Sequence, residues 1–426
     1  MNSSVVGAGS LQKCAKTIFE FVLARDWEVQ ETGLVDGTGQ EALIGGNSEN
    51  KNQVLLIHEG KEFEAMRRHG CEHLMPIACA CVPGSEWNSI VRDLPDFNYS
   101  LTLEYGEIVK SLHHSRVLRL HAYEGDRSIA ALQVEFRRGF VGWRAQVGSS
   151  RPSRGPGFSV QASPRAEAAS AMLLRELERK APGRLELVEV YASQPLKCFE
   201  RFGYIKRRNE NMLVTVDAPL RTLWARLTQS RKHGVRFASR SGVVVSEANG
   251  LDDFSKFYDL YLSTAKRVGF RPAEQPHLQR ILQILKNSEH PSALLLARHQ
   301  DKAIAAGLLI CCRSGWATWD IGCSDPEFWR LRPNDALIWE MIRLSHDSGS
   351  ILLNLGEGNY GFKGQFGGRS VPINRYVKTV LPTAVQSGYR WLNSHPLAKY
   401  ALFIASDSLP SMRRSIARMF PHVGES

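Results

Sequence analysis

An order of predicted elements that occurs twice constrains the fold of this chain more than any other feature. In each half, helical periodicity precedes alternating apolar strands, and a further helix and strand complete the series. The first series covers residues 81–218 and the second covers residues 219–382. Residue identities do not repeat, so the duplication lies in the pattern of elements. The sequence therefore predicts two related units in which strands and helices pack together.

The predicted elements follow directly from this periodicity. The first series comprises a helix from Ser85 or Glu86, strands near 117–123, 129–137 and 142–147, helices over 164–180 and 195–202, and strands over 185–191 and 211–217. The second comprises helices over 220–242, 251–268, 274–286 and 335–348, with strands over 293–298, 303–312, 316–323 and 351–355. Residues 1–80 form an N-terminal extension of unknown role, with predicted helices over 11–25 and 61–69 and a strand over 54–57. Residues 383–426 form a predicted C-terminal helical segment.

The charge of the chain indicates an anionic partner. The formal net charge is +11 and the pI is near 9.3, so the surface concentrates phosphates before any specific contact forms. This charge suits tRNA, coenzyme A, a nucleotide-sugar lipid or a membrane face, and it does not choose among them.

The cysteines and the N-terminal residues predict the compartment. None of the eight cysteines forms a C-x-x-C pair, so we interpret them as buried thiols in a reducing compartment and expect no metal site. The first residues lack the pattern of a signal peptide, and no stretch approaches the roughly 20 apolar residues of a membrane span. We therefore expect a soluble cytoplasmic protein that contacts the inner face of the membrane at most peripherally.

Two basic segments are candidate binding sites. The sequence RLRPNDA places Arg330 and Arg332 before a predicted helix that Asn334 or Asp335 caps, and free amides at a helix start can hold an anion. The alternative is an ordinary capped helix beside a solvated loop. The predicted helix over 220–240 carries a basic face that suits a tRNA backbone or a lipid diphosphate, or is simply solvated. That face comprises Arg221, Arg226, Arg231, Lys232, Arg236 and Arg240.

Four segments of the second half carry a specific resemblance. They are the basic run over 223–242, TAKRVGF over 264–270, LRPNDALIWEMIRLSHDSG over 331–349 and LNLGEGNYGFKGQFGG over 353–368. In order and spacing they resemble the FemAB peptidoglycan aminoacyltransferases and the CelD-like proteins of the GNAT superfamily. The resemblance covers roughly residues 87–380. It implies an α/β (α+β) fold of two tandem GNAT-like (acyl-CoA N-acyltransferase-like) domains, with mixed sheets flanked by helices.

The same resemblance implies particular site residues. FemAB relatives place a catalytic lysine in the last segment, which matches Lys363, with Phe362 holding it in place. Tyr360 of that segment is an expected substrate contact. Arg267 and Arg271 lie where the resemblance implies contact with a substrate phosphate. The alternatives are a surface lysine in a loop, and a helix C-terminus that favours cations.

The expected reaction is transfer of an acyl or aminoacyl group from an activated ester or thioester to an amine. The donor stays open between acyl-CoA and aminoacyl-tRNA, because the usual GNAT pyrophosphate loop, Q/R-x-x-G-x-G/A, is absent and RLRPNDA takes its place. No other cofactor is expected. The acceptor is expected to be an amine-bearing, phosphate-containing envelope precursor. The alternative function is a non-catalytic basic module that binds such a precursor or nucleic acid.

Other catalytic classes find no support in the sequence. It contains no G-x-S-x-G, no G-x-x-x-x-G-K-[ST], no H-E-x-x-H and no dinucleotide-binding fingerprint after a strand. Readings as a hydrolase, P-loop NTPase, zincin or dehydrogenase are therefore disfavoured.

Overall fold

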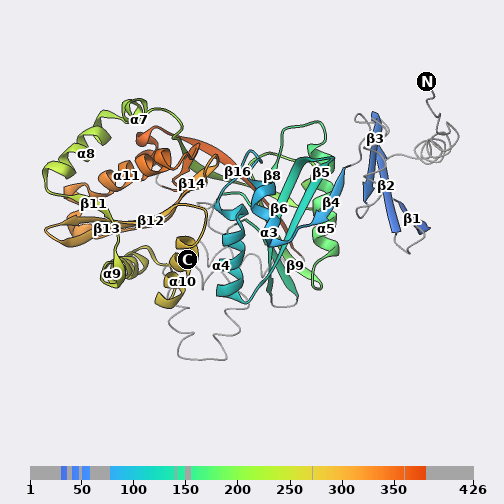
Figure 1. Ribbon diagram of the computed structural model, residues 1–426, viewed down its shortest axis with the longest axis horizontal. Coiled ribbons are helices and arrows are strands. Elements are labelled where there is room, and N and C mark those ends of the chain that lie inside the picture. Colours follow the sequence, from blue (N-terminus) through green and yellow to red (C-terminus); the bar gives the residue numbers. More distant parts are fainter. Residues whose placement is uncertain are drawn as a thin grey trace, which may run out of the picture.

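The computed structural model describes most of the chain between residues 77 and 379, together with three strands before it. The described residues are 30–35, 41–47, 50–57, 77–139, 142–148, 155–270, 272–358 and 360–379, with the backbone alone over 30–57 and at Tyr360. The predicted helices over 11–25 and 61–69 and the predicted helical segment over 383–426 lie outside these residues. In the N-terminal extension, β1 (Gln30–Val35), β2 (Glu41–Asn47) and β3 (Asn50–Ile57) form a three-stranded antiparallel sheet, blue in Figure 1.

The body of the protein alternates strands and helices in both halves. The first half contains β4 (Ala78–Cys81), α3 (Gly84–Val91), η2 (Tyr99–Leu101), α4 (Leu103–His113), β5 (Arg116–Glu124), β6 (Arg127–Arg138), β7 (Trp143–Val147), β8 (Phe158–Val160), α5 (Ala166–Arg179), β9 (Leu185–Ala192), α6 (Cys198–Arg201) and β10 (Ile205–Thr215). The second half contains α7 (Leu220–Arg226), α8 (Gln229–Arg240), β11 (Val244–Glu247), α9 (Gly250–Val268), α10 (Gln275–Lys286), β12 (Ser292–His299), β13 (Lys302–Ile310), β14 (Trp316–Ser324), η4 (Pro326–Leu331), α11 (Pro333–Asp347), β15 (Leu352–Asn354), α12 (Tyr360–Lys363), η5 (Gly364–Phe366) and β16 (Gly368–Thr379).

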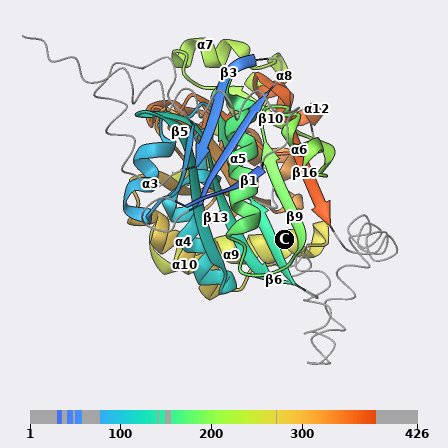
Figure 2. The same ribbon diagram turned by 90° about the vertical axis from the view of Figure 1, so that its right-hand side faces the viewer.

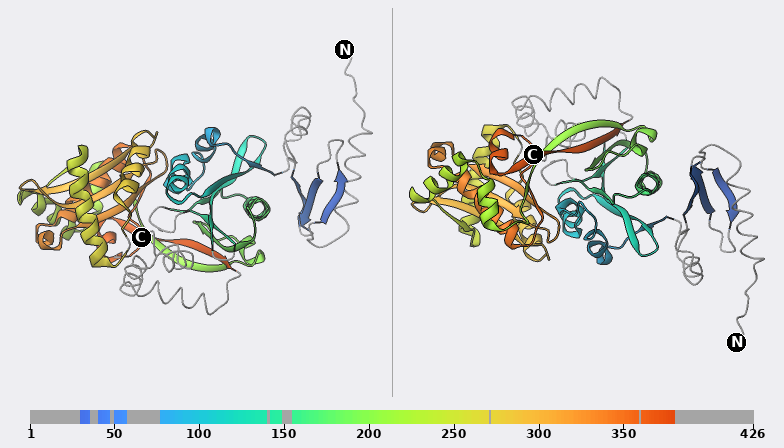
Figure 3. Two further views of the ribbon diagram at one scale, coloured as in Figure 1. Left: turned by 90° about the horizontal axis from the view of Figure 1, so that it is seen from below. Right: turned by 90° about the horizontal axis from the view of Figure 1, so that it is seen from above.

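A single 13-stranded mixed sheet joins the two halves. Its order is β11-β12-β13-β14-β15-β10-β16-β9-β7-β6-β5-β4, with β8 beside β6 and β9. The two halves exchange their last strands: β10 pairs with β15 of the second half, and β16 pairs with β9 of the first half. The light green β10 and the red β16 run side by side in both views of Figure 3, antiparallel from Ile205↔Val377 to Val214↔Gly368. The predicted mixed α/β fold is confirmed, whereas a separate sheet in each half was expected and one continuous sheet is found.

Helices cover both faces of this sheet and bury three main cores. Helix α5 lies along the strands of the first half (Figure 2), with Ala169, Leu173 and Leu177 at helical spacing wholly buried against them. In the second half, α8 and α11 pack on one face and α9 and α10 on the other (Figure 1). The buried faces of these helices hold the strands that carry the candidate site.

The basic helix predicted over 220–242 is two helices in the structure. Leu227 has an extended backbone conformation, and the Thr228 hydroxyl accepts a hydrogen bond from the amide of Arg231 at 3.4 Å, which starts α8. The sequence prediction also missed α4, because Gly106 lies inside it and lowers its helix propensity. A Cβ at Gly106 would approach the Gln133 side-chain oxygen to 2.6 Å, so close packing on the sheet accounts for the glycine.

Candidate functional site

The site is built where the parallel strands β14 and β15 part. Their pairing runs from Trp316↔Leu352 to Thr318↔Asn354 and ends there. Beyond it, the chain after β15 turns toward β10, where the amide of Leu355 donates to the carbonyl of Met212 at 2.9 Å. The later residues of β14 thus have no strand partner on this side among the described residues.

A β-bulge in β14 fixes the direction of Trp319. Leu308 lies opposite Ile321 and Leu309 lies opposite Trp319, so Asp320 is the extra residue. Trp319 consequently packs on the α11 face while Ile321 enters the core on the α9 face. The indole nitrogen of Trp319 donates to the carbonyl of Ile321 at 2.7 Å.

Glycine makes room for the ring of Trp319. A Cβ at Gly322 would lie 2.2 Å from a ring carbon of Trp319, so no larger residue fits there without moving the ring. Trp319 was not among the site residues predicted from the sequence. The available signal was a glycine on each of two adjacent strands, Gly307 and Gly322, because an interior strand glycine marks a close approach.

Lys363 lies beside this ring and is held by one hydrogen bond. Its Nζ stands 5.8 Å from the centroid of Trp319 and donates to the carbonyl oxygen of Glu357 at 2.6 Å. Burial lowers the pKa of the Lys363 ammonium from 10.5 to about 8, although the Glu357 carboxylate opposes that change. At pH 7 the ammonium is therefore mostly protonated, and it loses its proton as the pH rises through about 8.

Glu357 connects Lys363 with an arginine on β16. Its carboxyl is accessible to solvent, yet protein surrounds it closely enough that loss of hydration raises its pKa. Lys363 and Arg375 both act in the opposite direction on that pKa, so the two cations lie within electrostatic reach of one carboxylate. Sequence reasoning missed Glu357 and Arg375, because the pairing of β16 with the first half brings them together.

A buried ion pair anchors the segment that carries Lys363. Arg231 on α8 donates to Asp335 on α11 at 2.7 Å, and the two side chains are 10% and 3% exposed. The Arg231 Nε also donates to the Gln365 side chain at 3.1 Å, and its guanidinium lies 4.9 Å from the ring of Phe362. Phe362 in turn contacts Phe366, with ring centroids 5.4 Å apart. Phe362 thus fastens α12 to α8, and its role of holding the lysine stays a prediction.

The predicted roles of Asp335 and Arg231 need correction. Asp335 was expected to cap α11 and contact substrate, but it is buried against Arg231, and burial raises its pKa despite that partner. The residue at the cap position is Arg332, whose φ is 59°. Arg231 was counted in a basic face that either binds an anion or is solvated, and the structure buries it. A Cβ at Gly234 would lie 1.9 Å from Asp335, so the pair needs glycine on α8.

The predicted anion-binding residues gather at the end of β14. Ser324 accepts hydrogen bonds from the Trp329 indole at 2.9 Å and from the Asn334 side chain at 3.3 Å. The guanidinium of Arg267, at the end of α9, lies 5.1 Å from the ring of Trp329. Arg330, which follows Trp329 in the chain, is exposed. Arg271 lies outside the described residues, as does the side chain of Tyr360, so their predicted roles stay predictions.

The free amides expected at the start of α11 are largely absent. Pro333 has no amide hydrogen, and the amides of Asp335 and Ala336 already donate to the carbonyl of Arg332 at 3.1 and 3.4 Å. Anion binding here consequently depends on the exposed side chains of Arg330 and Arg332 and remains a prediction.

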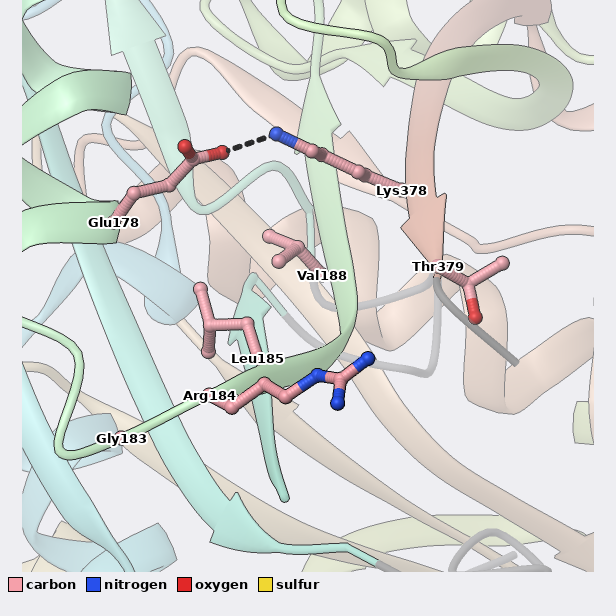
Figure 4. Close-up of a pocket in the computed structure, with 7 residues that line it drawn as sticks. All are labelled: Glu178, Gly183, Arg184, Leu185, Val188, Lys378 and Thr379. Atoms are coloured by element: carbon pink, nitrogen blue, oxygen red, sulfur yellow. Dashed lines mark hydrogen bonds and ion pairs between the residues drawn. The ribbon is translucent and has the colours of Figure 1, made fainter. Parts of the chain in front are cut away.

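A separate pocket of 320 Å³ lies in the first half, between α5 and the ends of β9 and β16 (Figure 4). Lys378 and Glu178 form an ion pair of 2.7 Å in its wall, above the apolar side chains of Leu185 and Val188. None of the predicted site residues lines it.

The described residues contain no cluster of histidine, cysteine, aspartate and glutamate side chains that could hold a metal ion. No helix within the described ranges is both long and apolar enough to cross a membrane.

Comparisons with known proteins give a family match for part of the second half. Residues 225–364 match the sequence model of the acetyltransferase (GNAT) domain family. The matched range contains Arg231, Trp319, Asp335 and Lys363. Residues 225–364 are thus similar in sequence to an acetyltransferase (GNAT) domain, and they lie on the mixed sheet of the second half.

Among solved structures, the chain is similar to FemX. The likeness covers 70% of this chain and 96% of FemX, with a TM-score of 0.58 and 14% sequence identity, so it concerns the fold. The chain is also similar to a tandem GNAT protein from the clavulanic acid biosynthesis pathway (11% identity, 72% and 99% coverage, TM-score 0.45). L-PGS from Bacillus licheniformis gives 13% identity, 71% and 94% coverage and a TM-score of 0.44. No curated protein sequence matches the chain. The predicted resemblance to FemAB-like GNAT acyltransferases is confirmed at the level of class and fold.

Proposed function

We propose that the protein is an N-acyltransferase that moves an acyl or aminoacyl group from an activated ester or thioester to an amine. One observation carries this proposal: the ammonium of Lys363 is held beside Trp319, where β14 and β15 part. A fixed cation at such a position stabilises negative charge that develops only during reaction.

In the proposed reaction, the amine nitrogen attacks the carbonyl carbon of the donor. A carbon–nitrogen bond forms, the carbonyl oxygen becomes negative, and Lys363 stabilises that oxygen. The carbon–oxygen or carbon–sulfur bond then breaks, the oxygen or sulfur leaves with the electron pair, and the proton that the amine loses passes through solvent to that leaving group. Phe362 and Arg231 position the lysine, since they fasten α12 to α8.

The identity of both substrates is part of the proposal. An acyl-CoA or an aminoacyl-tRNA is the proposed donor, and the proposed phosphate contacts are Arg267, beside Trp329, and the exposed Arg330 and Arg332. An amine-bearing envelope precursor is the proposed acceptor, which places the enzyme in the cytoplasm at the inner face of the membrane. The proposed domains are residues 81–218 and 219–382, flanked by the extension over 1–80 and the segment over 383–426.

A donor screen tests the proposal. Purified protein is incubated with acyl-CoA thioesters or charged tRNA and a pool of amine acceptors, and mass spectrometry identifies amide products. Wild-type protein is expected to form a new amide, Lys363→Met is expected to lose it, and the control Lys266→Met, an exposed lysine on α9, is expected to retain it. Binding without turnover across the screen would instead support a non-catalytic basic module.

A further inference from the structure

We propose that Arg207 and Arg375 form a phosphate-binding pair on the surface of β10 and β16, which takes the diphosphate of a nucleotide-bearing reactant. The pair lies in the first-half part of the junction, outside the matched GNAT domain and apart from the arginines at the end of β14. Its assignment to a reactant rests on the proposed function, whereas the binding of phosphate does not.

The strand register places the two guanidiniums on one face. Arg207 lies directly opposite Arg375 in the antiparallel pair of β10 and β16, and Arg375 lies directly opposite Tyr191 on β9. Residues opposite each other across strands point to the same side of a sheet. The guanidinium of Arg375 indeed lies 5.9 Å from the ring of Tyr191. Arg207, Arg375 and Tyr191 thus form one row across three strands.

One member of the row lies within electrostatic reach of the loop that precedes the candidate catalytic lysine. Arg375 and Lys363 both act on the carboxyl of Glu357, and Lys363 bonds the carbonyl of that residue. The carboxylate of Glu357 thus lies within electrostatic reach of both Arg375 and Lys363. The exchange of β10 and β16 between the halves creates this proximity.

The row of Arg207, Arg375 and Tyr191 carries more positive charge than its acidic partners neutralise. Arg375 pairs with the carboxylate of Glu189 on the same face. Arg207 is exposed and makes no hydrogen bond or ion pair with any described residue. Like charges directly opposite each other destabilise a sheet. A phosphate between them would reverse that effect, because guanidinium groups bind phosphate oxygens through pairs of charge-assisted hydrogen bonds.

The edge of β10 beside Arg207 also leaves room for a ligand. On the edge away from β16, β10 pairs with β15 only from Leu213 to Thr215, so residues 205–210 leave that edge without a strand partner among the described residues. Charged residues often protect such edges from pairing with other chains, and that role alone would explain a basic run. Lys206 and Arg208 are equally basic and exposed there. Arg208 differs from Arg207 because it points to the opposite face, where it pairs with Glu210 at 2.9 Å.

Arg207 and Arg208 consequently form a matched pair for an experiment. Titration calorimetry at low ionic strength measures the binding of inorganic pyrophosphate to wild type, Arg207→Ala and Arg208→Ala. Each variant loses one exposed positive charge from the same strand. Arg207→Ala is expected to raise the dissociation constant about tenfold or more, and Arg208→Ala less than about twofold. Arg207→Lys is expected to fall between wild type and Arg207→Ala, because an ammonium lacks the paired donors.

Two further arms distinguish the source of the phosphate. They use desulfo-coenzyme A, which represents a donor, and UDP, which represents a nucleotide-linked acceptor. The compound whose affinity falls in Arg207→Ala but not in Arg208→Ala is the one that the row binds. Equal effects of the two alanine variants, or no pyrophosphate binding by wild type, would overturn the proposal. If the row binds phosphate and the donor screen finds no amide product, the proposed function fails while the binding site stands.

Discussion

Lys363→Met is the substitution that tests the candidate site most directly. Methionine keeps most of the length of the side chain and removes its charge. If Lys363 stabilises the negative oxygen of the transition state, its loss is expected to lower turnover by roughly 100 to 1000-fold, with a smaller effect on substrate binding. Because the ammonium must be charged to act, the wild-type contribution is also expected to decline as pH rises through about 8.

The same substitution is expected to stabilise the folded protein at pH 7. Folding lowers the pKa of Lys363 from 10.5 to about 8. At about 1.4 kcal/mol per pKa unit, keeping this group charged in the folded protein lowers the free energy of unfolding by about 3 kcal/mol. Methionine removes that loss but also removes the hydrogen bond to the Glu357 carbonyl, which contributes about 1 kcal/mol. The expected net gain in the free energy of unfolding is about 2 kcal/mol.

The gain in stability from Lys363→Met is expected to depend on pH. Between about pH 8 and 10.5, the folded protein has released the Lys363 proton and the unfolded chain still holds it, so wild-type stability rises with pH in that window. The advantage of Lys363→Met is therefore expected to shrink from pH 7 to pH 10.5. Urea unfolding of both proteins, with Lys266→Met as control, measures the difference. A difference that is constant over this range, or turnover close to wild type, would refute the reasoning.

Three further substitutions test the surroundings of the lysine. Arg332→Ala is expected to raise the dissociation constant of the phosphate-bearing substrate severalfold, less so at high salt, and unchanged affinity at low salt would count against the anion site. Asp335→Asn leaves the charge of Arg231 buried, so urea unfolding should show a loss of about 3 to 5 kcal/mol; a loss below about 1 would show that the pair is not an anchor. Gly322→Ala is expected to displace Trp319, lowering turnover and changing tryptophan fluorescence; an unaltered spectrum would contradict the packing.

Most helices and strands could be predicted because their own periodicity specifies them. The α5 and α9 helices carry apolar residues at helical spacing, and both were predicted. Strand β16 was not, since Pro372 and several charged residues interrupt its pattern. Its extended form comes from pairing with β10 and β9, and Pro372 is tolerated because it precedes the pairing with β9, which begins at Asn374.

The candidate site was predictable only where a motif carried it. Lys363 and Phe362 stand out through their segment, and the structure places both beside a buried anchor. Arg231 could not be separated from its basic neighbours, because only the burial of α8 against α11 distinguishes it. Glu357 and Arg375 are far apart in sequence, and a strand pairing that no local pattern encodes brings them together.

The exchange of β10 and β16 has a consequence for synthesis on the ribosome. On the edge away from β7, strand β9 is paired only by residues 374–379, which leave the ribosome long after the rest of the first half. Until then, the nascent first half exposes an unpaired strand edge, which is prone to associate with other chains. Translation that stops before β16 would release such an edge permanently. Truncated chains are therefore expected to need chaperones or to aggregate, although their first-half sequence is complete.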